Sequence, residues 1–92
     1  MQTFTSTVCS RVGLHARPAA ILVKAASRFQ SAITIRNATT GSRAVNAKSI
    51  LLVLTLGVEQ GQAVTVTVCG ADETEAVTAL QEVIASGLGE AE

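Results

Sequence analysis

The chain has 92 residues, of which 48% are hydrophobic and 15% are charged. This balance excludes a disordered tail and a multidomain enzyme, and it predicts a single domain over residues 1–92. Phe4 and Phe29 are the only aromatic residues, so we expect a core of small side chains between thin layers, without a deep pocket. The longest charge-free, largely apolar run, residues 50–56, is far shorter than the roughly 20 residues of a membrane span. No basic and then apolar leader opens the chain, so we expect a cytoplasmic protein without membrane insertion.

The formal net charge of zero hides a separation of charge along the chain. All seven basic residues, from Arg11 to Lys48, precede all seven acidic residues, from Glu59 to Glu92. If folding keeps part of this separation in space, the basic side attracts phosphate groups or acidic partners. We favour such a functional face over the alternative of scattered solubilising charge.

The first predicted elements are a strand and a helix. Residues 3–9 alternate as a half-buried strand does, with Phe4, Ser6 and Val8 on one face. Residues 18–29 have the spacing of an amphipathic helix. The buried stripe of this helix is expected to consist of Leu22, Ala25, Ala26 and Phe29.

The middle of the chain contains two short predicted strands and one ambiguous segment. Residues 32–36 alternate as a strand, and residues 42–45 predict a weaker strand after a turn-like stretch. Residues 49–57 are apolar enough for either a buried strand or a short helix. We predict a helix, because Ser49 is a typical cap and Gly57 is a typical stop.

The last predicted strand and helix have the clearest patterns. Valines alternate with threonines over residues 63–69, which predicts a strand with a valine core face and a solvated threonine face. Asp72 with Glu75 resembles a capping box at the start of the last helix, and Gly87 followed by Leu88 is placed to end it. The residues that this helix is expected to bury are Ala76, Val77, Leu80, Val83 and Ile84. The resulting order of elements is βαββαβα.

His15 is the only histidine and lies between the first predicted strand and the first helix. The N–H groups of a first helical turn have no intrahelical acceptor, and a proline such as Pro18 is tolerated there. The positive end of the helix dipole therefore makes this junction suitable for an anion, and Arg17 adds donors that fit phosphate oxygens. A neutral imidazole is a nucleophile, so the site suits a group that accepts and then releases a phosphoryl group. The alternative is an exposed loop histidine with an arginine nearby.

The segment Gly13-Leu14-His15-Ala16-Arg17-Pro18-Ala19-Ala20 resembles the phosphorylation-site motif of the HPr family. These proteins are the small histidine-containing phosphocarriers of the bacterial phosphoenolpyruvate-dependent sugar phosphotransferase system. Two further segments resemble the same family, namely Asn46-Ala47-Lys48-Ser49-Ile50 with Leu56-Gly57, and Gly70-Ala71-Asp72-Glu73. The resemblance implies an α+β fold, an open-faced β-sandwich whose four-stranded antiparallel sheet is covered on one face by three helices.

The resemblance also implies a function for the chain. His15 would accept a phosphoryl group from phosphorylated enzyme I and donate it to sugar-specific IIA proteins, while Arg17 would bind the phosphate. Such a protein is a carrier in a relay and not an enzyme with its own turnover, and it is expected to be a monomer. The implied docking surface on the first two helices comprises Ala16, Ala20, Lys24, Lys48, Leu51 and Leu54. Because an all-apolar second helix cannot bury its whole circumference against one sheet, part of residues 50–56 is expected to be exposed.

Ser49 matches the serine that a dedicated kinase, opposed by a phosphorylase, modifies in part of the family. The alternative is a helix cap worth roughly 1 kcal/mol, with no regulation. A phosphate is tolerated at a helix N-terminus, so the two roles are compatible. Two features depart from the family pattern: the connection over residues 36–45 is longer, and Leu52 replaces a small or polar residue.

Two other functions compete with the carrier. A regulatory docking module of the same fold would bind a transcription factor or an enzyme without histidine phosphotransfer, but it would not need His15 together with Arg17. An RNA-binding domain would use the sheet face, which is rich in threonine and lacks aromatic residues for base stacking. We therefore expect no nucleic-acid partner.

Cys9 and Cys69 lack the spacing of a metal site, and with one histidine in the chain we expect no metal and no cofactor. The cytoplasm favours free thiols. The family topology pairs the first and last strands antiparallel, which would separate the two sulfurs by on the order of 20 Å. Both cysteines share the parity of the outward threonines, so we expect them to be at least partly exposed.

Overall fold

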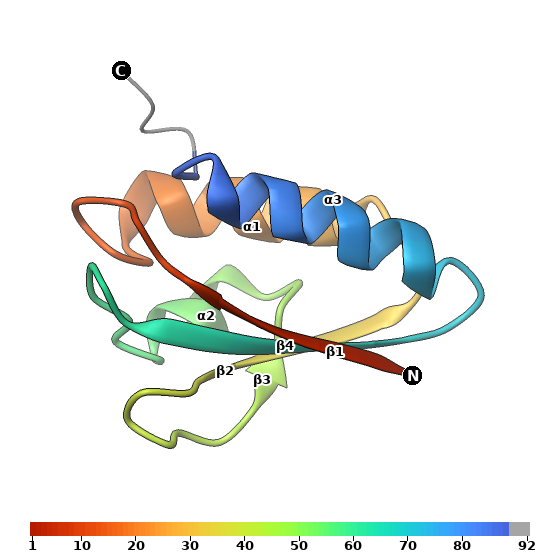
Figure 1. Cartoon of the computed structure of the whole chain (residues 1–92), viewed down its shortest axis with the longest axis horizontal. Coiled ribbons are helices and arrows are strands. Elements are labelled where there is room, and N and C mark those ends of the chain that lie inside the picture. Colours follow the sequence, from red (N-terminus) through yellow and green to blue (C-terminus); the bar gives the residue numbers. More distant parts are fainter. Residues whose placement is uncertain (89–92) are drawn as a thin grey trace.

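The structure is a computed structural model that describes residues 1–88 of the chain. These residues form elements in the predicted order βαββαβα (Figure 1). The elements are β1 (Gln2–Thr7), α1 (Ala16–Ser27), β2 (Ala32–Asn37), β3 (Val45–Asn46), α2 (Ile50–Leu54), β4 (Ala63–Cys69) and α3 (Glu73–Ala85).

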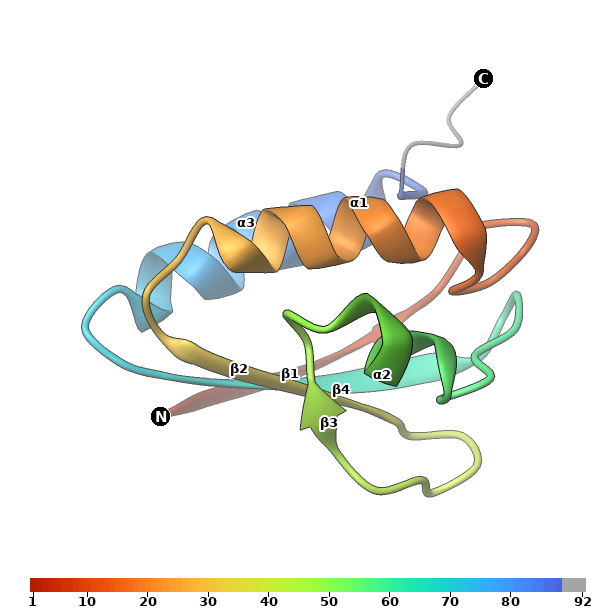
Figure 2. The ribbon, with the colours of Figure 1, turned by 180° about the vertical axis from the view of Figure 1, so that it is seen from behind.

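The four strands form one antiparallel sheet in the order β1-β4-β2-β3. Helices α1 and α3 lie side by side and antiparallel over one face of this sheet, and α2 contacts α1 on the same side (Figures 1 and 2). The predicted fold class, an open-faced β-sandwich with three helices on one face, is confirmed. The predicted pairing of the first and last strands is also confirmed, with Phe4 opposite Val66.

The two faces of the sheet follow the alternation in the sequence. The valines of β4 and the isoleucines of β2 are buried beneath the helices. On the open face, the hydroxyls of Thr3 and Thr67 are 3.3 Å apart, and those of Thr5 and Thr65 are 3.0 Å apart. The threonines therefore face solvent and also hydrogen-bond across the strand pair.

The fourth strand differs from the prediction, because β3 covers Val45–Asn46 and not residues 42–45. A turn occupies the preceding residues. The carbonyl of Asn37 accepts from the backbone N–H of Gly41 at 2.9 Å, and the Asn37 side-chain oxygen accepts from Thr39 N–H at 3.0 Å. The hydroxyl of Ser42 accepts from Asn37 N–H at 2.9 Å, so the start of the predicted strand belongs to this turn.

Helix α1 begins and ends two residues earlier than predicted. His15 has an extended backbone and occupies the N-cap position. At the other end, Phe29 N–H donates to the Ala26 carbonyl at 3.2 Å, which tightens the last turn before the helix would reach residue 29. The predicted buried stripe is present, with Phe29 only partly buried.

Helix α2 confirms the choice of helix for the ambiguous segment, although it is shorter than predicted. The Ser49 hydroxyl accepts from Leu52 N–H at 3.4 Å, as expected for an N-cap. Helix α3 also ends as predicted. Gly87 has a φ of 89°, and Leu88, fully buried, donates its N–H to the Val83 carbonyl at 3.2 Å.

The predicted capping box at the start of α3 is wrong. Asp72 is the N-cap residue, but its side chain makes no hydrogen bond to its own helix. Its carboxylate accepts from Ser31 N–H at 3.0 Å, from the Ser31 hydroxyl and from Gln30 N–H at 2.9 Å. These bonds, that of the Ser31 hydroxyl above all, lower the pKa of Asp72. Asp72 thus ties α3 to the turn between α1 and β2.

The two cysteines are free and exposed, which confirms the predicted exposure. The register pairs Gln2 with Val68 and Thr7 with Ala63. Cys69 and Cys9 therefore lie at opposite ends of the β1–β4 pair. In the region from residue 1 to residue 88, no helix is both long enough and apolar enough to cross a bilayer.

Candidate functional site

The candidate site is centred on His15, at the junction between β1 and α1 where the sequence predicts it. His15 is exposed, and its side chain does not cap the helix. The imidazole makes no hydrogen bond or ion pair to any other described residue. Its place at the N-cap puts it at the positive end of the α1 dipole, where a negative group is stabilised. Pro18 is the third helical residue, within the first turn as predicted.

The loop that carries His15 is fastened to the connection between α2 and β4. Leu14 N–H donates to the Val58 carbonyl at 2.9 Å. Gly13 has a φ of 64°, and a β-carbon at this position would lie 2.1 Å from the Val58 carbonyl oxygen. Only glycine permits this close approach, which determines how near the loop of His15 lies to the segment that contains Val58.

Further bonds join the same two segments. Val8 N–H donates to the Gln62 carbonyl and Gly61 N–H to the Val8 carbonyl, both at 2.9 Å. The side-chain amide of Gln60 donates to the Cys9 carbonyl at 3.5 Å. The two loops beside His15 therefore form one hydrogen-bonded unit.

A hollow of about 400 Å³ opens between these loops. The described residues that line it are Arg11, Val12, His15, Glu59 and Gln60. Arg17, the predicted phosphate-binding residue, is exposed in the first turn of α1 but is not one of them. The cation that shares the hollow with the histidine is Arg11.

The separation of charge in the sequence is not kept at this hollow. Glu59, the first acidic residue of the chain, lines it together with Arg11. Sequence reasoning missed Arg11, Glu59 and Gln60, because the loops meet only through bonds between positions far apart in the chain. The one residue in the sequence that could have indicated this contact is Gly13, because a glycine allows the loop of His15 to lie against the segment of Val58 and Glu59.

The predicted docking residues differ in how exposed their side chains are. Ala20 and Lys24 are exposed on α1, and Leu51 is 73% exposed on α2, whereas Leu54 is half-buried. The side chain of Ala16 lies outside the part of the structure that is described. Ile50 and Leu52 are also exposed, so the expectation of exposed apolar residues on α2 is confirmed.

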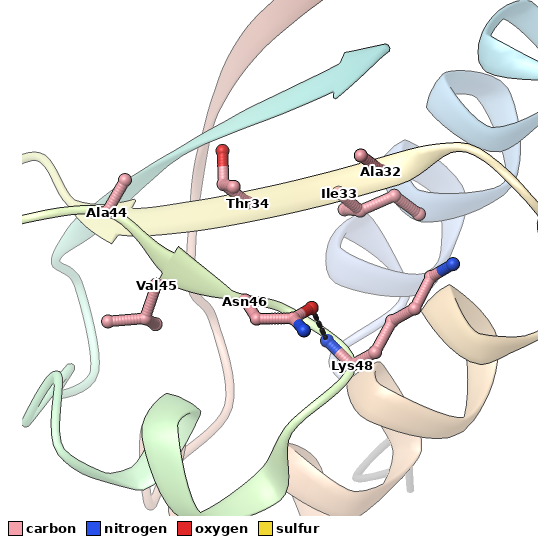
Figure 3. Close-up of a pocket in the computed structure, with 7 residues that line it drawn as sticks. All are labelled: Ala32, Ile33, Thr34, Ala44, Val45, Asn46 and Lys48. Atoms are coloured by element: carbon pink, nitrogen blue, oxygen red, sulfur yellow. Dashed lines mark hydrogen bonds between the residues drawn. The ribbon is translucent and has the colours of Figure 1, made fainter. Parts of the chain in front are cut away.

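Lys48, the remaining predicted docking residue, differs from the others because its side chain hydrogen-bonds within the protein. Its ammonium donates to the Phe29 carbonyl at 2.7 Å, just beyond the end of α1. Lys48 also lines an open hollow of about 390 Å³ where β3 pairs with β2 (Figure 3). In that view, the Lys48 backbone N–H donates to the Asn46 side-chain oxygen at 2.9 Å. Lys48 thus braces the segment before α2 against α1.

An exposed histidine at a helix N-terminus, on an open-faced sandwich and beside an open hollow, is the arrangement of a protein that presents a nucleophilic side chain on its surface. Within residues 1–88, no cluster of three or more histidine, cysteine or acidic side chains is placed to hold a metal ion.

Comparison with known proteins agrees with this class. The family described as the PTS HPr component phosphorylation site matches residues 2–86. The crystal structure of HPr-C-His from Thermoanaerobacter tengcongensis is 43% identical, with a TM-score of 0.91 over 98% of both chains. The solution structure of Crh, the Bacillus subtilis catabolite repression HPr, is 36% identical, with a TM-score of 0.64 over 90% of this chain and 95% of that one.

The multiphosphoryl transfer protein of Haemophilus influenzae is 43% identical over 86 residues, which are 94% of this chain and 17% of that protein. The chain thus spans about a fifth of the curated relatives it matches. The chain belongs to the PTS HPr family. Proteins of this family are phosphocarriers of the bacterial phosphotransferase system and not enzymes with independent turnover.

Proposed function

We propose that this chain carries a phosphoryl group on His15, accepting it from phosphorylated enzyme I and donating it to sugar-specific IIA proteins. The observation that carries this proposal is the exposed His15 side chain, which is unengaged by other described residues at the N-terminus of α1. The family supports action in the bacterial cytoplasm, and we propose that the carrier acts as a monomer.

In the proposed transfer, one ring nitrogen of His15 attacks the phosphorus of the donor phosphohistidine. A nitrogen–phosphorus bond forms on His15 while the donor bond breaks, and the donor ring keeps the electron pair. The positive end of α1 stabilises the charge on the moving group, and Arg17 donates to its oxygens. Donation to a IIA protein repeats the step, with His15 as the leaving group.

The proposed docking surface consists of exposed residues on α1 and α2. Ile50, Leu51 and Leu52 offer apolar side chains, while Lys24 and Ala20 are exposed on α1. Apolar anchors favour burial against a complementary partner, and the lysine favours acidic groups around them. Of the remaining predicted residues, Leu54 and Lys48 would support this surface, and Ala16 would extend it toward His15.

We further propose that phosphorylation of Ser49 by a serine kinase weakens docking, and that a phosphorylase restores it. Ser49 caps α2 directly before the exposed Ile50 and Leu51. A phosphate at this position adds negative charge beside an apolar surface that is proposed to meet acidic partners. Calorimetry with enzyme I is expected to give weaker binding for Ser49→Asp and little change for Ser49→Ala; equal affinity for Ser49→Asp and wild type would exclude this regulation.

Labelling with phosphoenolpyruvate tests the proposed carrier. The protein is incubated with enzyme I and labelled phosphoenolpyruvate, and the chemical stability of the attached label is measured. We expect label that is acid-labile and base-stable, and that is absent from His15→Ala with an unchanged circular dichroism spectrum. Wild-type protein that takes no label but still binds enzyme I would favour the alternative, a regulatory docking module that acts without histidine phosphotransfer.

A further inference from the structure

The hollow beside His15 contains two opposite charges that the proposed function leaves without a role. Arg11 reaches it from the loop before α1, and Glu59 reaches it from the connection between α2 and β4. Both side chains are exposed, and both line the same hollow as the imidazole. A phosphoryl group on His15 that enters this hollow therefore meets a cation on one wall and a carboxylate on the other.

We propose that Arg11 is a second phosphate-contacting residue of the transfer reaction, and that Glu59 weakens the hold on the phosphoryl group. This inference rests on the proposed function of His15. A phosphoryl group has between about one and two negative charges near neutral pH, and a guanidinium donates to its oxygens in a fork. A carboxylate across the same space repels it. A carrier must both accept and release the group, and the opposed charges limit how tightly it is held.

The walls of the hollow are held in place by the fold. The Glu59 N–H donates to the Gln62 side-chain oxygen at 3.0 Å. The same oxygen accepts from the side-chain amide of Asn37 at 3.1 Å, and Asn37 is fully buried. A buried amide network thus fixes the backbone of Glu59, and the Leu14–Val58 bond fixes the loop of His15 against it. The backbone on both sides of the hollow is therefore in place before a phosphoryl group arrives.

Two charge-removing variants with matched controls test the proposal. Arg11→Gln is compared with Arg36→Gln, which removes a charge from the open face of β2, and Glu59→Gln with Glu82→Gln on α3. The measured quantity is the single-turnover rate of label transfer from phosphorylated enzyme I at saturating concentration. We expect Arg11→Gln to slow transfer about 10-fold and Glu59→Gln to speed it about 2-fold, with both controls close to wild type.

Three readouts separate contact with phosphate from other roles of Arg11. Arg11→Lys should restore part of the rate, because it keeps the charge but loses the fork. Titration of the isolated protein with inorganic phosphate, followed by amide NMR, should shift signals of residues 11–15 and 59–60 more strongly in wild type than in Arg11→Gln. If Arg11→Gln changes only the concentration of enzyme I needed for half-maximal rate, Arg11 is a docking residue and the proposal is wrong.

Labelling of the wild-type protein separates the role of Arg11 from the carrier function of His15. If wild type takes label on His15 but Arg11→Gln matches Arg36→Gln in both rate and phosphate titration, the role of Arg11 is excluded and the carrier function stands. If wild type takes no label, the carrier function fails, and the role of Arg11 in transfer fails with it. A slower rate in Glu59→Gln than in Glu82→Gln would exclude the opposing role of Glu59.

Discussion

At the C-terminal end of α1, charged side chains hold the chain together, whereas at its N-terminal end they line an open hollow. Asp72 accepts three hydrogen bonds from Gln30 and Ser31, and Lys48 donates to the Phe29 carbonyl. At the other end the loops are joined mainly by backbone bonds, and the imidazole of His15 has no bond to another described residue.

This difference indicates which end of α1 can hold a reactive side chain in a carrier of this fold. A charge that stabilises the fold is committed to fixed partners, and moving it costs stability. A reactive group needs the opposite, a rigid backbone beneath a side chain that is not engaged. In this chain, Gly13 and the carbonyl of Val58 supply the rigid backbone, and the side chain of His15 makes no bond to another described residue.

The largest expected effect comes from breaking the backbone contact at the His15 end. Gly13→Ala places a β-carbon 2.1 Å from the Val58 carbonyl oxygen at a φ of 64°, so the two loops must separate. We expect a loss of about 3 kcal/mol or more in the free energy of unfolding, with slower phosphoryl transfer. Urea unfolding measures the first quantity. Gly41→Ala is the matched control, because Gly41 has a φ of 76° but a β-carbon there would meet no described atom beyond its chain neighbours within 4 Å; this variant should cost only about 1 kcal/mol.

A buried amide behind the hollow gives the next largest effect. Asn37→Ala removes bonds to the Leu56 carbonyl at 3.3 Å and to the Gln62 side chain at 3.1 Å. Because these partners lose a buried donor, we expect a cost of about 2–3 kcal/mol. Thermal or urea unfolding would detect it. The exposed Asn46→Ala should cost much less, and equal losses in the two variants would contradict a special role for Asn37.

The hydrogen-bonded carboxylate of Asp72, at the C-terminal end of α1, should make the free energy of unfolding depend on pH. The pKa of folded Asp72 is below its ordinary value of 3.8, so its stabilisation is present above that pH and is lost as the pH falls through the folded pKa. Asp72→Asn should lower stability at neutral pH and flatten the loss of stability as the pH falls below about 4. Unfolding curves across this range test the prediction. Glu75→Gln, on the same helix turn, is the control, and a steep acid transition that persists unchanged in Asp72→Asn would contradict it.

The smallest expected effect lies at the cap of α2. The bond from Leu52 N–H to the Ser49 hydroxyl is long, at 3.4 Å, so Ser49→Ala should cost about 0.5–1 kcal/mol. Ser49→Gly provides a comparison, because glycine is tolerated at this position, and it should cost only a few tenths of a kcal/mol. A loss above about 2 kcal/mol in Ser49→Ala would show that the hydroxyl does more than cap the helix.

The sequence predicted those features that depend on neighbouring residues. Alternating valines located β4 with its observed bounds, Ser49 was recognised as a cap, and Gly87 with Leu88 ended α3 as expected. Each of these signals comes from the local periodicity or from the conformational preference of one residue. The place of His15 beside the start of α1 was predicted from local signals as well, whereas its role in phosphotransfer was predicted from the family resemblance and stays a prediction.

The features that sequence reasoning missed depend on contacts between distant segments. Asp72 was predicted to bond within its own helix, but it bonds to Ser31, 41 positions away. The local preference of an aspartate allows a bond either to its own helix or to a neighbouring segment. The antiparallel packing of α1 and α3 places the turn between α1 and β2 beside Asp72, and the bond forms there. Arg11 and Glu59 likewise share a hollow only because two loops are joined by bonds from Leu14 and Gln60.

Amide NMR of the phosphorylated protein tests the contrast between the two ends of α1 most directly. We predict that phosphorus is attached to a ring nitrogen of His15, and that the largest amide shifts occur in residues 11–17 and 58–60. Signals of residues 30–31 and 70–73, around the committed Asp72, should stay close to their unphosphorylated positions. Phosphorus on another residue would contradict the role of His15, and shifts of equal size around Asp72 would contradict the contrast between the two ends of α1.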